Sequence, residues 1–421
     1  MGYLHRFIAS KFLYREEDGT RIKKILPTVR ISAIGIALGV SLILLSVFIV
    51  QGFKLEIREK INGFVGNIKI FHPENAHNQY TIPLETPKDL LEKIRGEIEA
   101  SDHSGIAYTF ADQMGVFKTD SAYRGVVIHG VDSLYNKEFF SKYLIRGECP
   151  SFDDIDKGSL LISSYLSQYL NIDVDSTTLA YFFDEGKVKV RKFVVKGIFR
   201  TGFKDYDEHL AIGNIKDIRS VLGWSTAQSG GIEIKLSDDR NTEEIYHKLY
   251  DILAQRVSDG QGRYTMLTAQ EMNPVMYGWV DLLDTNVRLI LILMIAVASM
   301  TIITGVIVII LEKVQAISTL KALGQSNQSL RKIFHHMAVR ILLKGLLWGN
   351  SIALIIAGLQ SYFKIFRLDA SQYYIEYVPI HISVWAILLT NALTIVALYL
   401  VIFIPTTIIS NIRPAEGVRF D

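Results

Sequence analysis

The sequence predicts an α-helical membrane protein with four transmembrane helices, arranged as one plus three, and a large α+β extracytoplasmic domain between the first and the second. Two observations lead to this fold class. Four runs carry no charged residue and are about as long as the ~20 residues that a helix needs to cross a bilayer core, namely residues 31–50, 289–311, 345–363 and 382–412. Between the first two runs lies a charged stretch, residues 54–285, which is long enough to bury a core of its own.

The distribution of charge predicts which side of the membrane each end of these helices faces. Residues 54–285 hold 27 basic and 35 acidic side chains and the rest of the chain holds 18 and 8, so the net charge of +2 hides two oppositely charged parts. Basic residues gather before the first run and in the 312–344 loop. Because positive residues favour the cytoplasmic side, we expect both termini and that loop in the cytoplasm and the large domain outside. The first run exceeds the roughly 7–15 residues of a signal-peptide core, so we expect a retained anchor.

These patterns assign every segment of the chain to a side of the membrane or to a span. The expected order is an amphipathic cytoplasmic N-terminal segment (1–30), transmembrane helix 1 (31–53), the outer domain with its stalks (54–285), transmembrane helix 2 (286–311), a cytoplasmic coupling loop (312–340), transmembrane helix 3 (341–363), a short outer loop (364–381), transmembrane helix 4 (382–410) and a cytoplasmic tail (411–421).

The outer domain combines short strands with helices. Alternation of apolar residues predicts strands at 126–128, 187–195 and 231–236, and helical spacing predicts helices at 88–99, 163–170, 215–222 and 242–257. Helical spacing also continues past the first span, which predicts a helical stalk that breaks at Gly63 and Gly66. Residues 281–288 are expected to form a second stalk. Since Cys149 is the single cysteine, no internal disulfide can stabilise this domain.

Gly35 and Gly39 form a G-x-x-x-G motif inside the first span. Small residues let two helices approach closely within lipid. We therefore predict that these two glycines pack against another helix, and a helix of a second copy of the chain is one candidate.

The cytoplasmic loop holds the sharpest local signal, a run of helix-forming residues that ends at Gly324, a good helix-ending residue. Its apolar positions are predicted to share one helical face, while Lys321 stays solvated; they are Val314, Ile317, Leu320 and Leu323. A second helix is expected to start at Ser329. A short amphipathic helix in the cytosol suits docking into the groove of a partner protein, and the alternative is a helix that rests on the membrane surface.

Several classes of protein are disfavoured by what the sequence lacks. No span holds an ionisable residue in its interior, which argues against ion-coupled carriers and proton pumps. The phosphate-binding pattern G-x-x-x-x-G-K-[ST] and the metal-binding pattern H-E-x-x-H do not occur, so we expect neither an enzyme nor a bound cofactor, metal or nucleic acid. His335 and His336 are adjacent in a predicted helix and point apart, which suits a solvated or interfacial pair.

The motifs of the chain resemble one family. Residues 312–324 are similar to the cytoplasmic loop of FtsX/MacB-type ABC permeases, and residues 51–68 to the stalk of the lipoprotein-releasing (LolC/LolE-like) subgroup of that family. Further stretches match the subgroup in the right order, namely residues 130–132, 195–199, 205–207, 373–380 and 414–416. At the place where one permease type carries a proline-containing hook for a periplasmic carrier, residues 178–194 are short, charged and free of proline, which argues against carrier docking there.

The resemblance implies a permease subunit of a mechanotransmitting ABC complex in the bacterial inner membrane, with its large domain in the periplasm. Its implied partners are a cytoplasmic ABC ATPase dimer that uses ATP and Mg²⁺, a second permease copy or paralogue, membrane lipids, a lipoprotein substrate and, as a candidate, a periplasmic carrier. The ATPase would hold the helix around 314–323, so the coupling residues are Val314, Ile317, Leu320, Lys321, Leu323 and Gly324. The alternatives are peptide or drug efflux, control of a cell-wall hydrolase, and a membrane receptor.

Lipid chemistry locates a candidate cavity. At ~0.8 kcal/mol per buried CH₂ group, moving one long acyl chain into water costs more than about ten kcal/mol. The acyl chains must therefore pass into another apolar environment. We expect it between the outer halves of the first and second spans, with Val47, Val50, Leu289 and Met294 as candidate lining residues.

Overall fold

The computed structural model describes residues 14–16, 23–25, 27–76, 81–102, 104–120, 122–153, 158–184 and 187–406. The chain divides into two compact units. The first comprises Met1–Lys54, Trp279–Arg367 and Tyr377–Asp421, and the second comprises Leu55–Gly278 and Leu368–Glu376. We call them the membrane unit and the outer unit. Most of the predicted N-terminal segment and the whole predicted tail, 411–421, lie outside the described residues.

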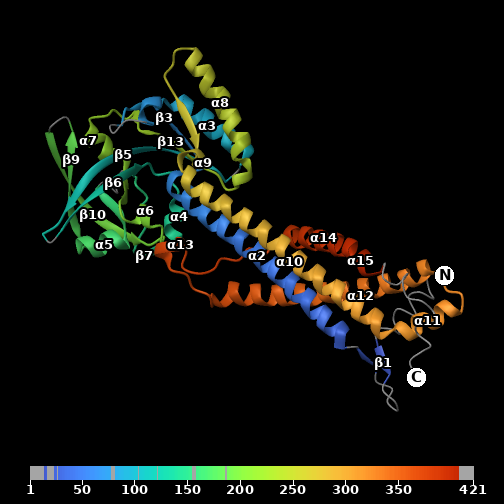
Figure 1. Ribbon diagram of the computed structural model, residues 1–421. Coiled ribbons are helices and arrows are strands. Elements are labelled where there is room, and N and C mark those ends of the chain that lie inside the picture. The colour runs from blue at the N-terminus through green and yellow to red at the C-terminus, as the bar shows by residue number, and fades with distance from the viewer. Residues whose placement is uncertain are drawn as a thin grey trace. The chain divides into compact units, whose positions relative to one another are not determined.

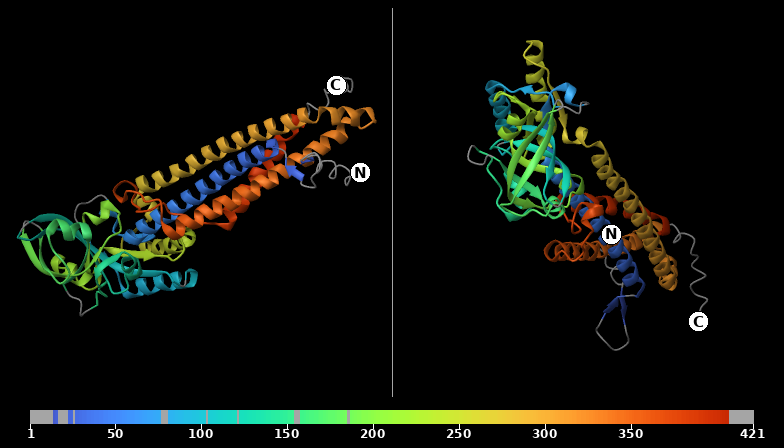
Figure 2. Two further views of the ribbon diagram at one scale, coloured as in Figure 1. Left: turned by 90° about the horizontal axis from the view of Figure 1, so that it is seen from below. Right: turned by 90° about the vertical axis from the view of Figure 1, so that its left-hand side faces the viewer.

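The membrane unit is built from four long helices that run side by side (Figures 1 and 2). They are α2 (Pro27–Val65), α10 (Pro274–Glu312), α12 (Asn327–Phe363) and α14 (Val384–Val401), which α15 (Phe403–Thr406) extends. All four are long and apolar enough to cross a membrane, which confirms the predicted one-plus-three arrangement. Near the N-terminus, β1 (Tyr14–Glu16) pairs with β2 (Lys23–Ile25).

The helix of the first span continues well beyond its apolar run, as its spacing predicts. It ends at Val65, and Gly66 then takes a positive φ of 70°, which glycine adopts without steric cost. The predicted break at Gly63 is wrong, because this glycine lies inside α2. The ring of Phe139 occupies the space where a side chain of residue 63 would stand. Close packing is therefore the role of Gly63.

The outer unit is organised around one ten-stranded sheet. Its strands are β3 (Ile68–Phe71), β5 (Ile106–Lys118), β6 (Tyr123–Val131), β7 (Leu144–Gly147), β8 (Ser159–Ser163), β9 (Thr177–Asp184), β10 (Lys187–Phe199), β11 (Leu210–Asn214), β13 (Gly231–Lys235) and β14 (Thr265–Thr268). Separately, β4 (Leu84–Glu85) pairs with β12 (Gln228–Ser229). The predicted strands at 126–128, 187–195 and 231–236 correspond to β6, β10 and β13.

The long strand β5 belongs to two substructures. Its first half pairs with β13 in an open sheet of order β14-β3-β13-β5. Its second half pairs with β9, which closes a ring of pairings through β6, β11, β8, β10 and β9 back to β5. Closing a sheet on itself removes exposed edges and encloses a core of inward-facing side chains.

Two clusters of apolar side chains stabilise these substructures. On the open sheet, α3 (Lys88–Ser101) and α8 (Thr242–Ser258) lie side by side (Figure 1) and share a buried core with Ile68, Ile70, Ile232 and Ile234. The closed ring is filled by a second core that includes residues of α5 (Ser164–Leu170) and α7 (Ile215–Leu222). These four helices match the helices predicted from the sequence. Shorter helices are η1 (Pro73–Ala76), α4 (Lys137–Lys142), α6 (Lys204–Asp207), η2 (Asp239–Asn241), α9 (Ala269–Met272) and α13 (Ala370–Tyr373).

Candidate functional site

The glycine motif of the first span is covered by a helix of its own chain. A Cβ atom on Gly35 would stand 2.7 Å from Thr301 Cγ2, and one on Gly39 would stand 3.7 Å from Ala298 Cβ, both on α10. Close approach of two backbones is what small residues permit in a membrane. The two glycines therefore pack α2 against α10, and this face is not open to a second copy of the chain.

A second glycine pair, which the sequence reasoning missed, packs the other side of α2. On α12, a Cβ atom on Gly345 would stand 2.6 Å from Ile36 Cγ2, and one on Gly349 would stand 2.8 Å from the Ala37 carbonyl oxygen. These two residues also form G-x-x-x-G, so the signal was present in the sequence. Helix α2 is thus held between α10 and α12 through small residues on both sides.

A polar pair joins the last two spans. Asn350 on α12 and Asn391 on α14 exchange two amide hydrogen bonds, each 2.8 Å long. Each side-chain amide also donates to the carbonyl one turn earlier in its own helix. Hydrogen bonds of this kind stabilise helix pairs in lipid by roughly 0.6–2 kcal/mol. The search for ionisable residues in the spans could not find this pair, because asparagine carries no charge.

The helix predicted around residues 314–323 is present as α11 (Val314–Ala322). Its end has Schellman geometry, since the Gly324 amide donates to the Lys321 carbonyl, the Gln325 amide donates to the Leu320 carbonyl, and Gly324 has a φ of 88°. Helix α12 then begins after Ser326, whose hydroxyl accepts from the Ser329 amide. The helix predicted from Ser329 therefore starts two residues earlier, at Asn327.

The apolar positions of α11 differ in burial: some are buried in the chain's own core and others are exposed. Ile317 is completely buried and belongs to the same cluster as Leu330, Ile333 and Phe334 of α12, and Leu320 packs partly against that cluster. Leu323, by contrast, is 79% exposed. The expectation that all four apolar positions face a partner is wrong for Ile317, because its side chain already lies in the core of its own chain. The surface that a partner can reach comprises Gln315, Thr319 and Ala322 of α11 and the two residues that follow it, Leu323 and Gly324.

The four candidate lipid-binding residues lie on the surface of the membrane unit. Val47, Val50 and Met294 are half-buried, and Leu289 is 61% exposed. Around Leu289, α10 presents a broad apolar surface that includes Ile292, Leu293 and Met300. Of the four spans, α14 and α10 bury the smallest shares of their apolar windows. In this chain Leu289 is therefore open to its surroundings, and the other three residues are partly covered.

The histidine pair in α12 does point apart, as expected of neighbours in a helix. His335 packs against the rings of Tyr399 and Phe403, at 4.7 and 4.9 Å between ring centroids. His336 instead lies near its own helix, with Nδ1 2.6 Å from the Lys332 carbonyl oxygen. Among the described residues, no group of three metal-ligating side chains comes together.

The outer unit holds a buried network of charges that sequence reasoning missed. The strand register places Lys69 of β3 and Tyr108 of β5 on either side of Glu233 of β13, and Asp112 of β5 opposite His129 of β6. Glu233 lies 3.0 Å from Lys69 Nζ, 3.3 Å from His129 Nε2 and 2.9 Å from the Tyr108 hydroxyl, which donates to it. On the other side, His129 Nδ1 lies 2.5 Å from Asp112.

Burial and ion pairing shift the pKa values of these groups in opposite directions. Burial alone would lower the pKa of His129, but the carboxylates of Glu233 and Asp112 outweigh it and raise the pKa to about 9. In the same way, burial would raise the pKa of Glu233, whereas Lys69 and His129 hold it below its ordinary value. Glu233 and His129 are therefore both charged at neutral pH, and each compensates the other.

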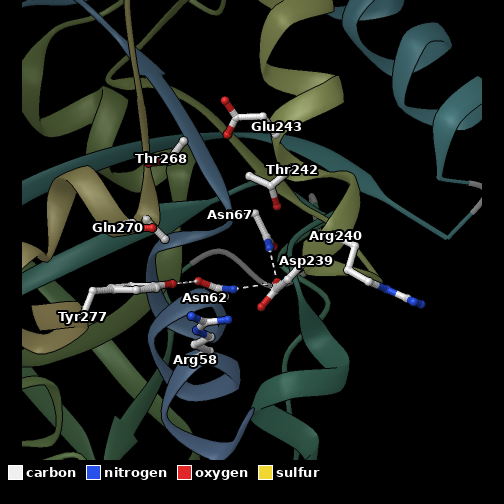
Figure 3. A pocket seen from close by; sticks show the side chains of 11 residues that line it. Arg58, Asn62, Asn67, Asp239, Arg240, Thr242, Glu243, Thr268, Gln270 and Tyr277 are labelled. Carbon is white, nitrogen blue, oxygen red and sulfur yellow. Dashed lines mark hydrogen bonds between the residues drawn. The ribbon is translucent and has the colours of Figure 1, made fainter. Parts of the chain in front are cut away.

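A polar cavity of about 210 Å³ lies where α2 ends and α10 begins (Figure 3). Asp239 accepts hydrogen bonds from the side chains of Asn62 (2.8 Å) and Asn67 (2.6 Å), and the Tyr277 hydroxyl donates to Asn62 (3.0 Å). The guanidinium of Arg58 stands 5.9 Å from the centre of the Tyr277 ring. These bonds connect the ends of α2 and α10 to η2, which directly precedes α8, so this cavity is part of a structural junction.

Comparisons with known proteins identify relatives that align with most of the length of this chain. Residues 288–414 match the family model described as FtsX-like permease C-terminal. The lipoprotein-releasing system transmembrane protein LolC of Neisseria meningitidis serogroup B is 22% identical over 408 residues, which cover 93% of this chain and 94% of that protein. LolE of Haemophilus influenzae is 21% identical over 403 residues, covering 92% and 93%. The resemblance seen in the sequence motifs is therefore confirmed.

Among solved structures, the periplasmic region of MacB from Actinobacillus actinomycetemcomitans covers 52% of this chain and 97% of its own, at 14% identity and a TM-score of 0.35.

Proposed function

We propose that this chain, which carries an FtsX-like permease domain at residues 288–414 and is similar to LolC and LolE along most of its length, is the permease subunit of a lipoprotein-releasing ABC complex. The observation that carries the proposal is the coverage. A relative named for lipoprotein release aligns with 93% of this chain, so the likeness extends over the outer unit as well as the spans. Four spans with a large domain between the first two suit a subunit that acts on both sides of a membrane.

The energy source in this proposal is a separate cytoplasmic ATPase that uses ATP and Mg²⁺. The chain contains no phosphate-binding G-x-x-x-x-G-K-[ST] pattern of its own. The exposed residue Thr319 of α11 and Leu323, which directly follows this helix, form the surface on which we expect the ATPase to dock. Ile317 anchors this helix to α12 from the inside, so a displacement of α11 is passed to the third span.

The proposed substrate is a lipoprotein with its acyl chains still attached. Because each chain costs more than about ten kcal/mol to expose to water, the permease must offer it an apolar surface. The apolar wall around Leu289 and Met294 of α10, together with Val47 and Val50 of α2, suits this role. A second permease, identical or paralogous, would close the open side of this wall.

The location that follows is the bacterial inner membrane. We propose that both termini and α11 lie in the cytoplasm and the outer unit in the periplasm, since basic residues surround α11. Single cysteines introduced at exposed positions test this in a Cys149→Ser background. A membrane-impermeant thiol reagent added to spheroplasts should label Ser225→Cys in the outer unit and leave Ser326→Cys before α12 unlabelled. The reverse labelling would contradict the proposed orientation.

Co-purification tests the central claim. The full-length chain is extracted from its native membrane in a mild detergent, and the bound proteins are identified by mass spectrometry. We expect an ABC ATPase together with acylated proteins. An ATPase without acylated proteins would favour efflux or hydrolase control, and the absence of an ATPase would favour a receptor; either result overturns the proposed function.

A further inference from the structure

The segment between the third and fourth spans belongs structurally to the outer unit. Residues Leu368–Glu376 group with the outer unit, although Arg367 and Tyr377, which flank them, belong to the membrane unit. The base of the segment is closed by a backbone bridge between Arg367 and Tyr377 and by a 2.9 Å hydrogen bond from the Leu368 amide to the Glu376 carbonyl. The chain therefore passes between the two units here, as it does in α2 and α10.

A buried lysine of the first stalk holds this segment. Lys60 on α2 is only 3% exposed, and its Nζ donates to the carbonyl oxygen of Tyr374 at 2.7 Å and to that of Thr201 at 2.5 Å. A buried ammonium group is costly unless each of its protons is bound, and here backbone carbonyls of two separate segments bind it. Replacing this lysine by an apolar residue would leave both carbonyls without their donor.

The second of these carbonyls belongs to a rigid turn. Asp207 of α6 accepts hydrogen bonds from the Thr201 amide (3.2 Å), the Thr201 hydroxyl (2.7 Å) and the Gly202 amide (3.0 Å). The ring of Phe203, next in the turn, stacks on that of Tyr374 at 4.7 Å. Lys60 thus fastens the segment to a part of the outer unit that has little freedom to move.

The backbone of the segment is itself constrained. Tyr374 has a φ of 60°, a left-handed conformation that a bulky residue adopts only when its surroundings impose it. The following side chain, Ile375, is 1% exposed. Stacking on one side, burial on the other and the Lys60 hydrogen bond between them account for this conformation.

We propose that Lys60 is a positioning residue of the transport cycle, because it makes segment 368–376 a third mechanical link between the outer unit and the spans. This inference rests on the proposed function. When the outer unit moves, α2 and α10 carry the motion to the first two spans through continuous helices. The fastened segment carries it to α12 and α14, whose ends it joins. Without the fastening, these two spans would no longer follow the outer unit.

The test uses the full permease–ATPase complex in proteoliposomes. Lys60→Met removes the ammonium and keeps a long side chain, and Lys204→Met, whose side chain is 60% exposed, is the matched control. Two quantities are measured, namely hydrogen exchange of residues 368–376 and the number of lipoproteins released per ATP hydrolysed. In Lys60→Met we expect exchange to rise about tenfold and release per ATP to fall about fivefold, while ATP hydrolysis stays close to wild type. A lysine that only stabilised the fold would lower hydrolysis and release together.

Each outcome decides one claim. Unchanged exchange in Lys60→Met would show that Lys60 does not fasten the segment. Raised exchange with unchanged release per ATP would overturn the mechanical link. A wild-type complex that releases no lipoprotein contradicts the proposed function, and the exchange measurement still decides the fastening. If Lys60→Met fails to assemble, Phe203→Leu removes the ring stack on Tyr374, leaves both carbonyls and does not change the backbone of the segment. We then expect about threefold changes in both quantities, and wild-type values would overturn the link.

Discussion

Glu233 is a fully buried carboxylate in the middle of an open sheet, and the residues around it explain why it is tolerated. Lys69, His129 and the Tyr108 hydroxyl each lie within 3.3 Å of it. Breaking such a network by removing one partner leaves an uncompensated charge, which is strongly destabilising. The strand sequence Ile-Glu-Ile at 232–234 predicts the opposite, an outward-facing Glu233, because alternation in a strand cannot reveal what covers its second face.

The raised pKa of His129 predicts how the stability of the outer unit depends on pH. The folded-state pKa is about 9, above the ordinary value of 6.5, so the stabilisation is complete below about 6.5 and is lost as the pH rises through about 9. At most about 3 kcal/mol of stability is involved. We expect hydrogen exchange of β5 and β6 in the full-length protein, corrected for the intrinsic rate, to accelerate between pH 7 and pH 10.

A histidine-to-glutamine pair provides the control for this pH effect. His129→Gln should exchange faster at pH 7 and lose most of the further acceleration, because no proton remains to be lost at this position. His247→Gln, at a side chain that is 71% exposed, should behave like wild type. Equal pH dependence in all three proteins would mean that His129 does not control the stability of the sheet.

At the scale of elements, the membrane unit depends on how closely α2 approaches its two neighbours. Gly349 faces the Ala37 carbonyl oxygen of α2, whereas nothing lies within 4 Å of a Cβ atom built on Gly358 of the same helix. The same substitution, glycine to alanine, therefore has opposite consequences two and a half turns apart. Helical spacing alone cannot distinguish the two glycines, since it does not reveal which side of a helix another helix covers.

Gly349→Ala should lower the stability of the membrane unit by roughly 1–3 kcal/mol, because the added methyl group overpacks the contact with α2. Gly358→Ala should be neutral or slightly stabilising, since alanine favours helix more than glycine does. The thermal midpoint of the detergent-solubilised full-length chain, followed by size-exclusion chromatography, compares the two. A loss of stability in Gly358→Ala equal to that in Gly349→Ala would contradict the assigned contact.

Helix α11 has a buried side chain, Ile317, that packs against α12, and it is followed by an exposed side chain, Leu323, that a partner can reach. Substitutions at these two residues therefore test packing and docking separately. Leu323→Asp should reduce co-purification of the proposed ATPase about tenfold, as expected when an apolar anchor of an interface is lost, and leave thermal stability unchanged. Ile317→Ala should destabilise the chain by about 2–5 kcal/mol because it opens a cavity. Gln328→Asp, an exposed position at the start of α12, is the control for added charge. Normal ATPase recovery with Leu323→Asp would refute docking at α11.

At the scale of the whole molecule, the apolar wall and the outer unit belong to one proposed cycle of lipid release. A charge on the wall should block the passage of acyl chains without disturbing the cytoplasmic surface. We expect Val47→Arg and Met294→Arg to abolish lipoprotein release and to retain the ATPase. Leu389→Arg on α14, at a side chain that is 72% exposed, carries a comparable insertion cost of about 2.5–3.5 kcal/mol and serves as the control. Release by the two wall variants at the level of this control would place the lipid path elsewhere.

The sequence by itself determined the four spans, the order of the units, the secondary structure of α3, α5, α7, α8 and α11, and the resemblance to FtsX-like permeases. These features follow from local properties. The length of an apolar run, the spacing of apolar residues and the positions of glycines can all be read directly from the sequence. Even the packing role of Gly35 and Gly39 could be predicted, although the identity of the facing helix, α10, could not.

Only the tertiary structure decided which residues meet across large separations in sequence. It brought Lys60 to Tyr374, Lys69 to Glu233 and Asn350 to Asn391, and it turned Ile317 inward while leaving Leu323 exposed. The physical reason is the same in each case. Whether a polar side chain is satisfied, and whether an apolar one is available to a partner, depends on what packs against it, and a single sequence does not record those neighbours.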